Sequence, residues 1–297
     1  MVRCPPRDRA GDSVKKPFGA SAQRTHRPQI VTQLAKALSA AEPSVTAGND
    51  REGHVRYDVC GVPISALRMD EAAKLIVSAA LREEPLQVHL CNAYTLSLVD
   101  GDPELRAALT SAELNLPDGT PVAWLGRSRG VTDPVRGPSL VAAVACAGAP
   151  AGVRHYLYGG AVGVADLMCQ RLAQTVPGIQ IVGVEAPDYH DLDDQEFSEL
   201  CKRIRQSKSM LVWVGLGTPR QDHLVPRLAQ ALHLPVVPVG AAFDFWSGRV
   251  PEAPRFLQGS GVEWVYRFVH EPRRLWRRYV FGNIRFVRAV IRHSRGS

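Results

Sequence analysis

Two acidic residues stand where apolar segments give way to turns, and both could serve a binding or catalytic site. Asp118 lies in Pro117-Asp118-Gly119, after the apolar segment 112–116, where a carboxylate can act as a general base. The same triplet can also be an ordinary turn whose aspartate caps the next helix. Asp244 is a lone acid within Gly240-Ala-Ala-Phe-Asp244, among apolar and glycine residues that are typical of a substrate pocket.

Glycine-rich turns follow two further apolar segments, at residues 158–163 and 215–217. Backbone N–H groups at such a turn, just before a helix, can cradle a phosphate. Both turns depart from the G-x-G-x-x-G dinucleotide fingerprint, because Tyr158 and Arg220 stand where glycines belong. Each turn alone is compatible with a plain strand-to-helix connection. Together they favour a nucleotide or sugar-nucleotide pocket.

Other catalytic and metal-binding patterns are weaker. The D-x-D within residues 191–194 could hold a divalent metal under a diphosphate, but its place before a helical pattern favours a helix cap. His89, His190 and His223 have unrelated spacings, and most of them are expected to be structural or solvent-facing. The six cysteines are scattered singly, which argues against a zinc site and a disulfide framework and fits a reducing cytosol.

The positive charge of the chain is concentrated at its C-terminal end. The formal net charge is +7, and residues 261–297 hold nine arginines against two acids, Glu263 and Glu271. Such a segment favours partners that carry phosphate, whether nucleic acid, anionic lipid or a pyrophosphate substrate. A solvated basic helix without a partner is the alternative.

Apolar segments with strand and helix periods alternate along the chain, which predicts an α/β domain with a Rossmann-like, largely parallel sheet and flanking helices. Asp70 and Asp102 are placed to cap two of the helices. After an edge strand or hairpin near 55–63, strands are expected at 86–92, 112–116, 155–158, 179–184, 210–214 and 236–239. Helices are expected at 70–82, 93–99, after Asp102, around 122–125, and at 164–174, 194–206 and 221–232.

Three parts of the chain differ in composition. Residues 1–50 are rich in Pro, Ser, Arg and Lys and are expected to be mostly disordered, with a short helix near 32–41. Residues 51–260 form the expected α/β domain, and residues 261–297 form a basic, aromatic C-terminal helical appendage. No signal peptide is expected, because no apolar region follows the early charges. No transmembrane segment is expected either, because the longest weakly polar run, at 140–153, is too short and too rich in Gly and Pro.

Parallel strands bring their carboxyl ends to one edge of a sheet, where ligands of open α/β sheets bind. The segments expected at that edge carry most of the polar candidates of the chain. They are Asn92, Asp118, Gly159–Gly163, Ala186–Tyr189, Gly215–Gln221 and Gly240–Asp244.

Six motifs in order, spanning about residues 57–286, resemble the WecG/TagA/CpsF glycosyltransferases. The motifs are Asn92-Ala93, Leu116-Pro-Asp-Gly119, Tyr158-Gly-Gly-x-x-Gly-Val-Ala165, Val214-Gly-Leu-Gly-Thr-Pro-Arg-Gln-Asp222, Val239-Gly-Ala-Ala-Phe-Asp244 and Glu263-Trp-x-Tyr-Arg followed by Glu271-Pro-x-Arg-Leu-x-Arg-Arg-Tyr279. The resemblance implies an inverting, metal-independent transferase without a cofactor. It would move an N-acetylmannosamine-type sugar from UDP to a polyprenyl-diphosphate-linked GlcNAc, in the synthesis of teichoic-acid-like or other cell-surface polymers.

The resemblance also assigns roles to residues. Asp118 is implied as the catalytic base, and the C-terminal arginines are implied to dock on the membrane and to close over the donor pyrophosphate. The substrate-binding residues expected on this basis, together with the glycine turns, are Asn92, Thr95, Gly159, Gly160, Tyr189, Gly217, Gln221, Asp244, Arg273, Arg274, Arg277 and Arg278. Leu90 departs from the family, whose members often carry threonine there, so either Asn92 or Thr95 compensates or the substrate differs.

The resemblance places the protein in the cytoplasm, attached peripherally to the inner face of the cell membrane through an anionic lipid surface. Self-association of the chain is left open, and nucleic acid is not expected as a partner. Two alternatives remain at this stage. One is an NAD(P)-linked oxidoreductase in which Glu185 would hold a ribose, and the other is a nucleic-acid-binding module that uses the arginine-aromatic segment.

Overall fold

A computed structural model of the chain describes residues 53–188, 190–250, 282 and 285–293. Within them, a six-stranded, all-parallel sheet has the strand order β4-β3-β8-β7-β5-β6, and a separate antiparallel hairpin precedes it. The Rossmann-like α/β prediction is therefore confirmed. The hairpin is β1 (Arg56–Val59) and β2 (Val62–Ser65), and the sheet strands are β3 (Leu86–Cys91), β4 (Leu114–Pro117), β5 (Arg154–Gly159), β6 (Gln180–Glu185), β7 (Leu211–Gly215) and β8 (Pro235–Pro238).

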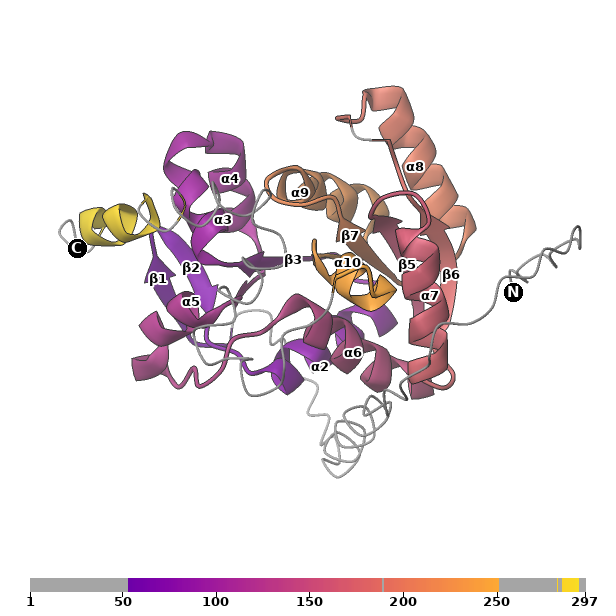
Figure 1. The fold of residues 1–297 in the computed structure, drawn as a ribbon, viewed down its shortest axis with the longest axis horizontal. Helices are drawn as coiled ribbons and strands as arrows, with labels where there is room; N and C mark the ends of the chain where they lie inside the picture. Colours follow the sequence, from indigo (N-terminus) through magenta and orange to yellow (C-terminus); the bar gives the residue numbers. More distant parts are fainter. Residues whose placement is uncertain (1–52, 189, 251–281, 283–284, 294–297) are drawn as a thin grey trace, which may run out of the picture.

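Helices cover both faces of the sheet (Figure 1). One face carries α2 (Met69–Leu81), α6 (Gly137–Gly148), α7 (Val164–Thr175) and α10 (Ala242–Ser247). The other carries α4 (Pro103–Ser111), α8 (Asp194–Gln206) and α9 (Arg220–Leu232). The short helices α3 (Ala93–Leu98) and α5 (Thr120–Leu125) follow β3 and β4 directly, and the 3-10 turns are η1 (Val99–Gly101), η2 (Arg127–Arg129) and η3 (Ala149–Ala151).

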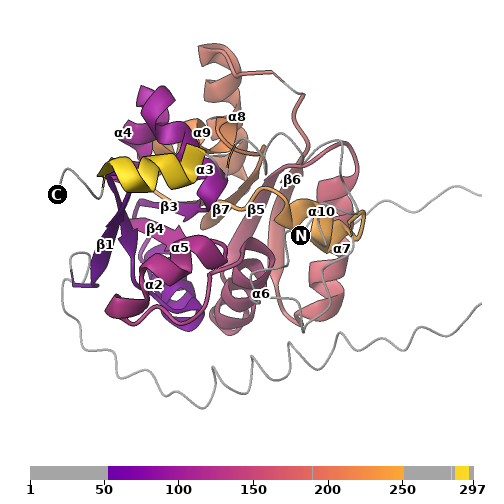
Figure 2. The same ribbon diagram turned by 60° about the vertical axis from the view of Figure 1, so that its left-hand side comes forward.

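The period of two along the strands explains this layering, because successive side chains point to opposite faces of a sheet. In β7, Leu211 and Trp213 are buried against α2, α6, α7 and α10, whereas Val212 and Val214 are buried against α8 and α9. A third core lies beneath the hairpin. It includes Phe286 and Ala289 of the helical residues 285–293, which are the C-terminal helix seen beside α3 in Figure 2.

Helix caps follow the sequence signals at two of three sites. Asp102 caps α4 by accepting from the Leu105 N–H at 2.9 Å, and Asp193 caps α8 by accepting from the Glu196 N–H at 2.8 Å. The D-x-D motif therefore supplies the cap of α8, as its position before a helical pattern predicts. The predicted cap at Asp70 is wrong. α2 begins one residue earlier, at Met69, so Asp70 lies in its first turn and pairs with Arg68 instead.

The chain reverses its direction of travel across the sheet between β5 and β7. The connection through α7 places β6 on one side of β5, and the connection through α8 returns to place β7 on the other side. Such a reversal opens a crevice beyond the carboxyl ends of the two strands, which is where open α/β sheets bind ligands. Among the described residues, no helix has the length and apolar character needed to span a membrane.

Candidate active site

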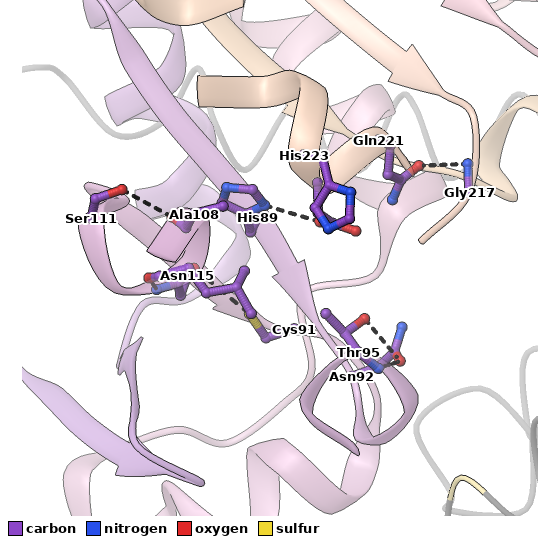
Figure 3. A network of polar contacts seen from close by, with 12 residues as sticks. His89, Cys91, Asn92, Thr95, Ala108, Ser111, Asn115, Gly217, Gln221 and His223 are labelled. Carbon is purple, nitrogen blue, oxygen red and sulfur yellow. Dashed lines mark hydrogen bonds and ion pairs between the residues drawn. The ribbon is translucent and has the colours of Figure 1, made fainter. Parts of the chain in front are cut away.

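Asn92 and Asp118 meet at the carboxyl ends of the neighbouring strands β3 and β4. The Asn92 side chain caps α3, because its Oδ1 accepts from the backbone N–H groups of Tyr94 and Thr95, each at 3.1 Å. The Thr95 hydroxyl donates to the same Oδ1 at 3.3 Å, as Figure 3 shows. With Oδ1 occupied by these donors, Nδ2 of Asn92 faces Asp118 and donates to its Oδ2 at 3.2 Å.

The backbone also fixes Asp118 in this place. Its N–H donates to the Cys91 carbonyl at 3.0 Å, which is the last hydrogen bond of the pairing of β3 and β4. Gly119 then turns the chain into α5 with φ +85°, a conformation that favours glycine. Asp118 is thus a half-buried carboxylate at a strand end, with a neutral amide donating to one of its oxygens. A group of this kind can accept a proton from a substrate hydroxyl.

The backbones of β5 and β7 lie in close contact at their carboxyl ends, where the crevice begins. The Gly160 N–H donates to the Gly215 carbonyl at 3.0 Å, and a Cβ on Gly159 would lie 2.6 Å from the Gly215 backbone. Close packing is therefore sufficient to explain the glycine at 159, and the approach of a phosphate stays a prediction. The N–H of Gly160 is already used within the fold, so this group is not available as a phosphate donor in this arrangement.

Gln221 connects two loops at the same edge of the sheet. Its side chain is 6% exposed, and its Oε1 accepts from the Gly217 N–H at 3.0 Å (Figure 3). Gly240, which follows β8, approaches the same atom, because a Cβ added there would lie 3.3 Å from Oε1. The Thr218-Pro219 peptide bond between the two ends of this contact is cis. Since Oε1 already accepts a hydrogen bond from the Gly217 loop, the NH2 group is the part of Gln221 that can bind a ligand.

Asp244 lies in the first turn of α10, a helix that the sequence analysis does not predict. Its neighbour Phe243 is 1% exposed and packs into the crevice, where a Cβ on Gly215 would lie 2.5 Å from the Phe243 ring. This contact holds α10 over the ends of β5 and β7. The half-buried Asp244 side chain is therefore carried at the crevice rather than at a strand end.

A cavity of about 200 Å³ lies beside the crevice, toward α8 and α9. Its lining includes Tyr158, Leu216 and Arg220, together with Pro187 and Asp188 from the loop after β6. Burial raises the pKa of Tyr158 to about 12, so its hydroxyl remains protonated at neutral pH. The structure thus brings the ends of β5, β6 and β7 together around one opening, as the parallel topology predicts.

Glu185 does not offer a free carboxylate to this opening. Arg203 donates to both of its oxygens, at 2.9 and 3.1 Å, and the Tyr156 hydroxyl donates to Oε1. A ribose would have to compete with these partners, which removes the main support for an NAD(P)-linked enzyme. Among the described residues, no three His, Cys, Asp or Glu side chains cluster as a metal site would require.

The pairing of His89 with Asp222 and the position of Arg136 are not predicted from the sequence. His89 and Asp222 are buried at 0% and 1% exposure, and Nδ1 of His89 lies 2.9 Å from Oδ1 of Asp222. The pair connects β3 to the N-terminal turn of α9, next to Gln221. Arg136 precedes α6 at the same edge, where the Val135 N–H donates to the Pro117 carbonyl at 2.8 Å.

The predicted site residues therefore fall into three groups. Asn92, Thr95 and Asp118 form one contact network, and Gly159, Gly160, Gly217, Gln221 and Asp244 lie at or after the carboxyl ends of β5, β7 and β8 at the same edge of the sheet. Leu90, in the position of the family threonine, is 7% exposed and belongs to the core, and its Cδ1 would lie 3.2 Å from a Cβ on Gly137. Tyr189, Arg273, Arg274, Arg277 and Arg278 lie outside the described residues, so their roles remain predictions.

Comparison with known proteins identifies the family of the chain. The sequence model of the glycosyl transferase WecG/TagA/CpsF family matches residues 57–297. A relative from Bacillus spizizenii, the enzyme N-acetylglucosaminyldiphosphoundecaprenol N-acetyl-beta-D-mannosaminyltransferase, is 31% identical over 199 residues, which cover 66% of this chain and 75% of the relative. The chain thus belongs to the WecG/TagA/CpsF family of glycosyl transferases, and it is an enzyme that transfers a sugar.

Proposed function

We propose that this enzyme transfers an N-acetylmannosamine-type sugar from UDP to a polyprenyl-diphosphate-linked GlcNAc, in the synthesis of a cell-surface polymer. The observation that carries the proposal is the Asn92–Asp118 contact at 3.2 Å, at the same edge of the sheet as the reversal between β5 and β7, where open α/β sheets bind nucleotides. The name of the Bacillus spizizenii relative supports both the sugar and the acceptor class.

The proposed reaction is a single displacement with inversion. Asp118 accepts the proton of the acceptor hydroxyl as that oxygen attacks the anomeric carbon of the donor. The bond between the anomeric carbon and the diphosphate oxygen breaks on the opposite face, and UDP leaves with the bonding electrons. Asn92 stabilises the ionised Asp118 before the reaction, which makes the carboxylate ready to act as the base.

Negative charge that develops on the departing diphosphate requires preorganised positive groups. In this proposal the arginines at 273, 274, 277 and 278 supply them, so that no metal ion is needed. The NH2 group of Gln221 and the carboxylate of Asp244 bind the donor at the crevice, which is consistent with their places beside Gly217 and Phe243. The basic C-terminal segment holds the enzyme at the inner face of the cell membrane, where a lipid-linked acceptor is found.

A UDP-release assay tests this function. It uses a panel of UDP-sugars with a short-chain lipid-diphosphate-GlcNAc acceptor, with and without EDTA. We expect release to require both the acceptor and a UDP-activated N-acetylhexosamine, and to be insensitive to EDTA. NMR of the product should show the anomeric configuration opposite to that of the donor. Absence of release with every UDP-sugar would reject the proposed donor, and a retained configuration would reject the single displacement.

A further inference from the structure

A short helix beside Asp118 exposes an aromatic and an aliphatic side chain next to each other. Trp124 and Leu125, at the C-terminal end of α5, are 52% and 44% exposed. Arg127 and Arg129 follow in η2, both exposed, and the Arg127 guanidinium lies 5.3 Å from the centre of the Trp124 ring. We refer to these four residues as the α5 patch.

The exposure of the α5 patch is imposed by the anchoring of the opposite side of α5. Val122 and Ala123 are buried in the core beneath the hairpin, and the Tyr57 hydroxyl donates to the Val122 carbonyl at 3.0 Å. Gly126 packs so closely on Tyr57 that a Cβ there would lie 2.5 Å from the ring. The helix therefore cannot rotate to bury Trp124 without breaking these contacts.

The composition of the α5 patch matches an anionic bilayer surface. Tryptophan, with an apolar body and a polar N–H, favours the interface between water and lipid, and arginines pair with lipid phosphates. Residues 119–132 contain no acidic residue, so no negative charge within this segment opposes such contact. A single exposed leucine needs no explanation, whereas adjacent exposed Trp and Leu beside two arginines form a coherent surface.

We infer that the α5 patch is a second membrane contact of this enzyme, separate from the C-terminal segment, and that its partner is an anionic lipid surface. The inference rests on the proposed function, because a lipid-linked acceptor must reach Asp118 from a bilayer. α5 begins two residues after Asp118. Lipid contact at the patch therefore brings the catalytic carboxylate to the membrane surface at which the acceptor diphosphate lies.

The test compares the full-length double variant Trp124→Glu/Leu125→Glu with the double variant Leu81→Glu/Leu167→Glu. Leu81 and Leu167 are similarly exposed leucines, at 45% and 41%, on α2 and α7, so the control adds the same charge elsewhere. Each protein is sedimented with phosphatidylglycerol-containing vesicles and with phosphatidylcholine vesicles. Each is also assayed with an undecaprenyl-linked acceptor in vesicles and with a water-soluble short-chain acceptor.

We expect the patch variant to bind anionic vesicles at least about tenfold more weakly than the control. Its transfer to the vesicle-embedded acceptor should fall by a similar factor, while transfer to the soluble acceptor stays within about twofold. Arg127→Gln/Arg129→Gln should reduce the preference for phosphatidylglycerol over phosphatidylcholine.

Unchanged vesicle binding in the patch variant overturns the inference. A changed oligomeric state by light scattering, with vesicle binding intact, also overturns it and assigns the patch to a second copy of the chain. A parent enzyme that is inactive on the soluble acceptor counts against the proposed function, and the sedimentation experiment then still decides whether the patch binds lipid.

Discussion

Asn92 donates a hydrogen bond to Asp118 across 3.2 Å because its own carbonyl oxygen is occupied by the N-terminus of α3. The orientation of the amide is thus set by the helix cap, and the cap in turn sets which group faces the carboxylate. One side chain therefore both caps α3 and contacts Asp118, the proposed catalytic base. This arrangement explains how a loop residue can be held with the rigidity that proton transfer requires.

Replacing Asn92 by aspartate should separate these two roles. Aspartate also caps helices well, so α3 should remain intact. The amide of residue 92 that donates to Asp118 would be replaced by a second carboxylate, and repulsion between the two like charges would raise the pKa of Asp118. The acidic limb of the pH profile of kcat/KM should therefore move to higher pH by about one unit or more. An unchanged acidic limb in an active, folded Asn92→Asp enzyme would show that Asp118 does not titrate in the reaction.

Gln221→Glu should preserve the loop contact and weaken donor binding. The glutamate can still accept from the Gly217 N–H, so folding should change little. It replaces the NH2 group by a negatively charged oxygen where the diphosphate is proposed to bind. We expect KM for the UDP-sugar to rise at least about tenfold, which corresponds to about 1.4 kcal/mol of binding. Steady-state kinetics at varied donor concentration measures this, and an unaltered KM would place the donor elsewhere.

The buried His89–Asp222 pair should show strong coupling in unfolding experiments. Removing one member leaves a buried polar partner, so Asp222→Leu alone should reduce the free energy of unfolding by about 3–5 kcal/mol. Replacing both, as His89→Leu/Asp222→Leu, should restore much of that loss, because two apolar side chains leave no unpaired group. A double-mutant cycle in urea gives the coupling energy. Simple additivity of the two single losses would contradict the pair as described.

His155 should make stability depend on pH below neutrality. It is buried, stacks on Trp213 and accepts from the Trp213 indole N–H at 3.1 Å, and burial lowers its pKa to about 4. The unfolded chain, with the ordinary pKa near 6.5, binds more protons between these values. Stability from this residue is therefore full above about pH 6.5 and is lost as the pH falls toward 4, by at most about 3 kcal/mol.

His155→Asn provides the matched comparison for this effect. Asparagine can still accept from the indole N–H but does not titrate. Urea unfolding of both proteins at several pH values should show a smaller loss on acidification in the variant. Parallel pH dependence of the two proteins would mean that other groups cause the acid sensitivity.

The order of the elements and the edge that carries the site follow from the sequence. Strand and helix periods alternate clearly, and parallel topology then brings Asn92, Asp118 and Gln221 to one edge without further information. The caps at Asp102 and Asp193 could be predicted because each aspartate directly precedes a helical pattern. The predicted cap of α2 is displaced by two residues, because Glu71 accepts from the Arg68 N–H, so that Arg68 rather than Asp70 is the N-cap residue.

Other features depend on contacts that a sequence does not display. α6 has nine buried residues out of twelve, because it packs against α2, α10 and the sheet, so it lacks the one-sided apolar pattern that marks a surface helix. α10 is six residues long, too short to show a period. His89 and Asp222 are 133 residues apart, and their contact exists only because α9 packs on β3.

The central claim is that Asp118 is the base, and Asp118→Asn tests it most directly. Asparagine has the same shape and can still accept from Nδ2 of Asn92, but it cannot take a proton. UDP binding by calorimetry and sugar transfer by UDP release should be measured on the same preparation. We predict UDP affinity within about twofold of the parent and transfer reduced at least about 100-fold. Full transfer activity in the folded variant would contradict the account.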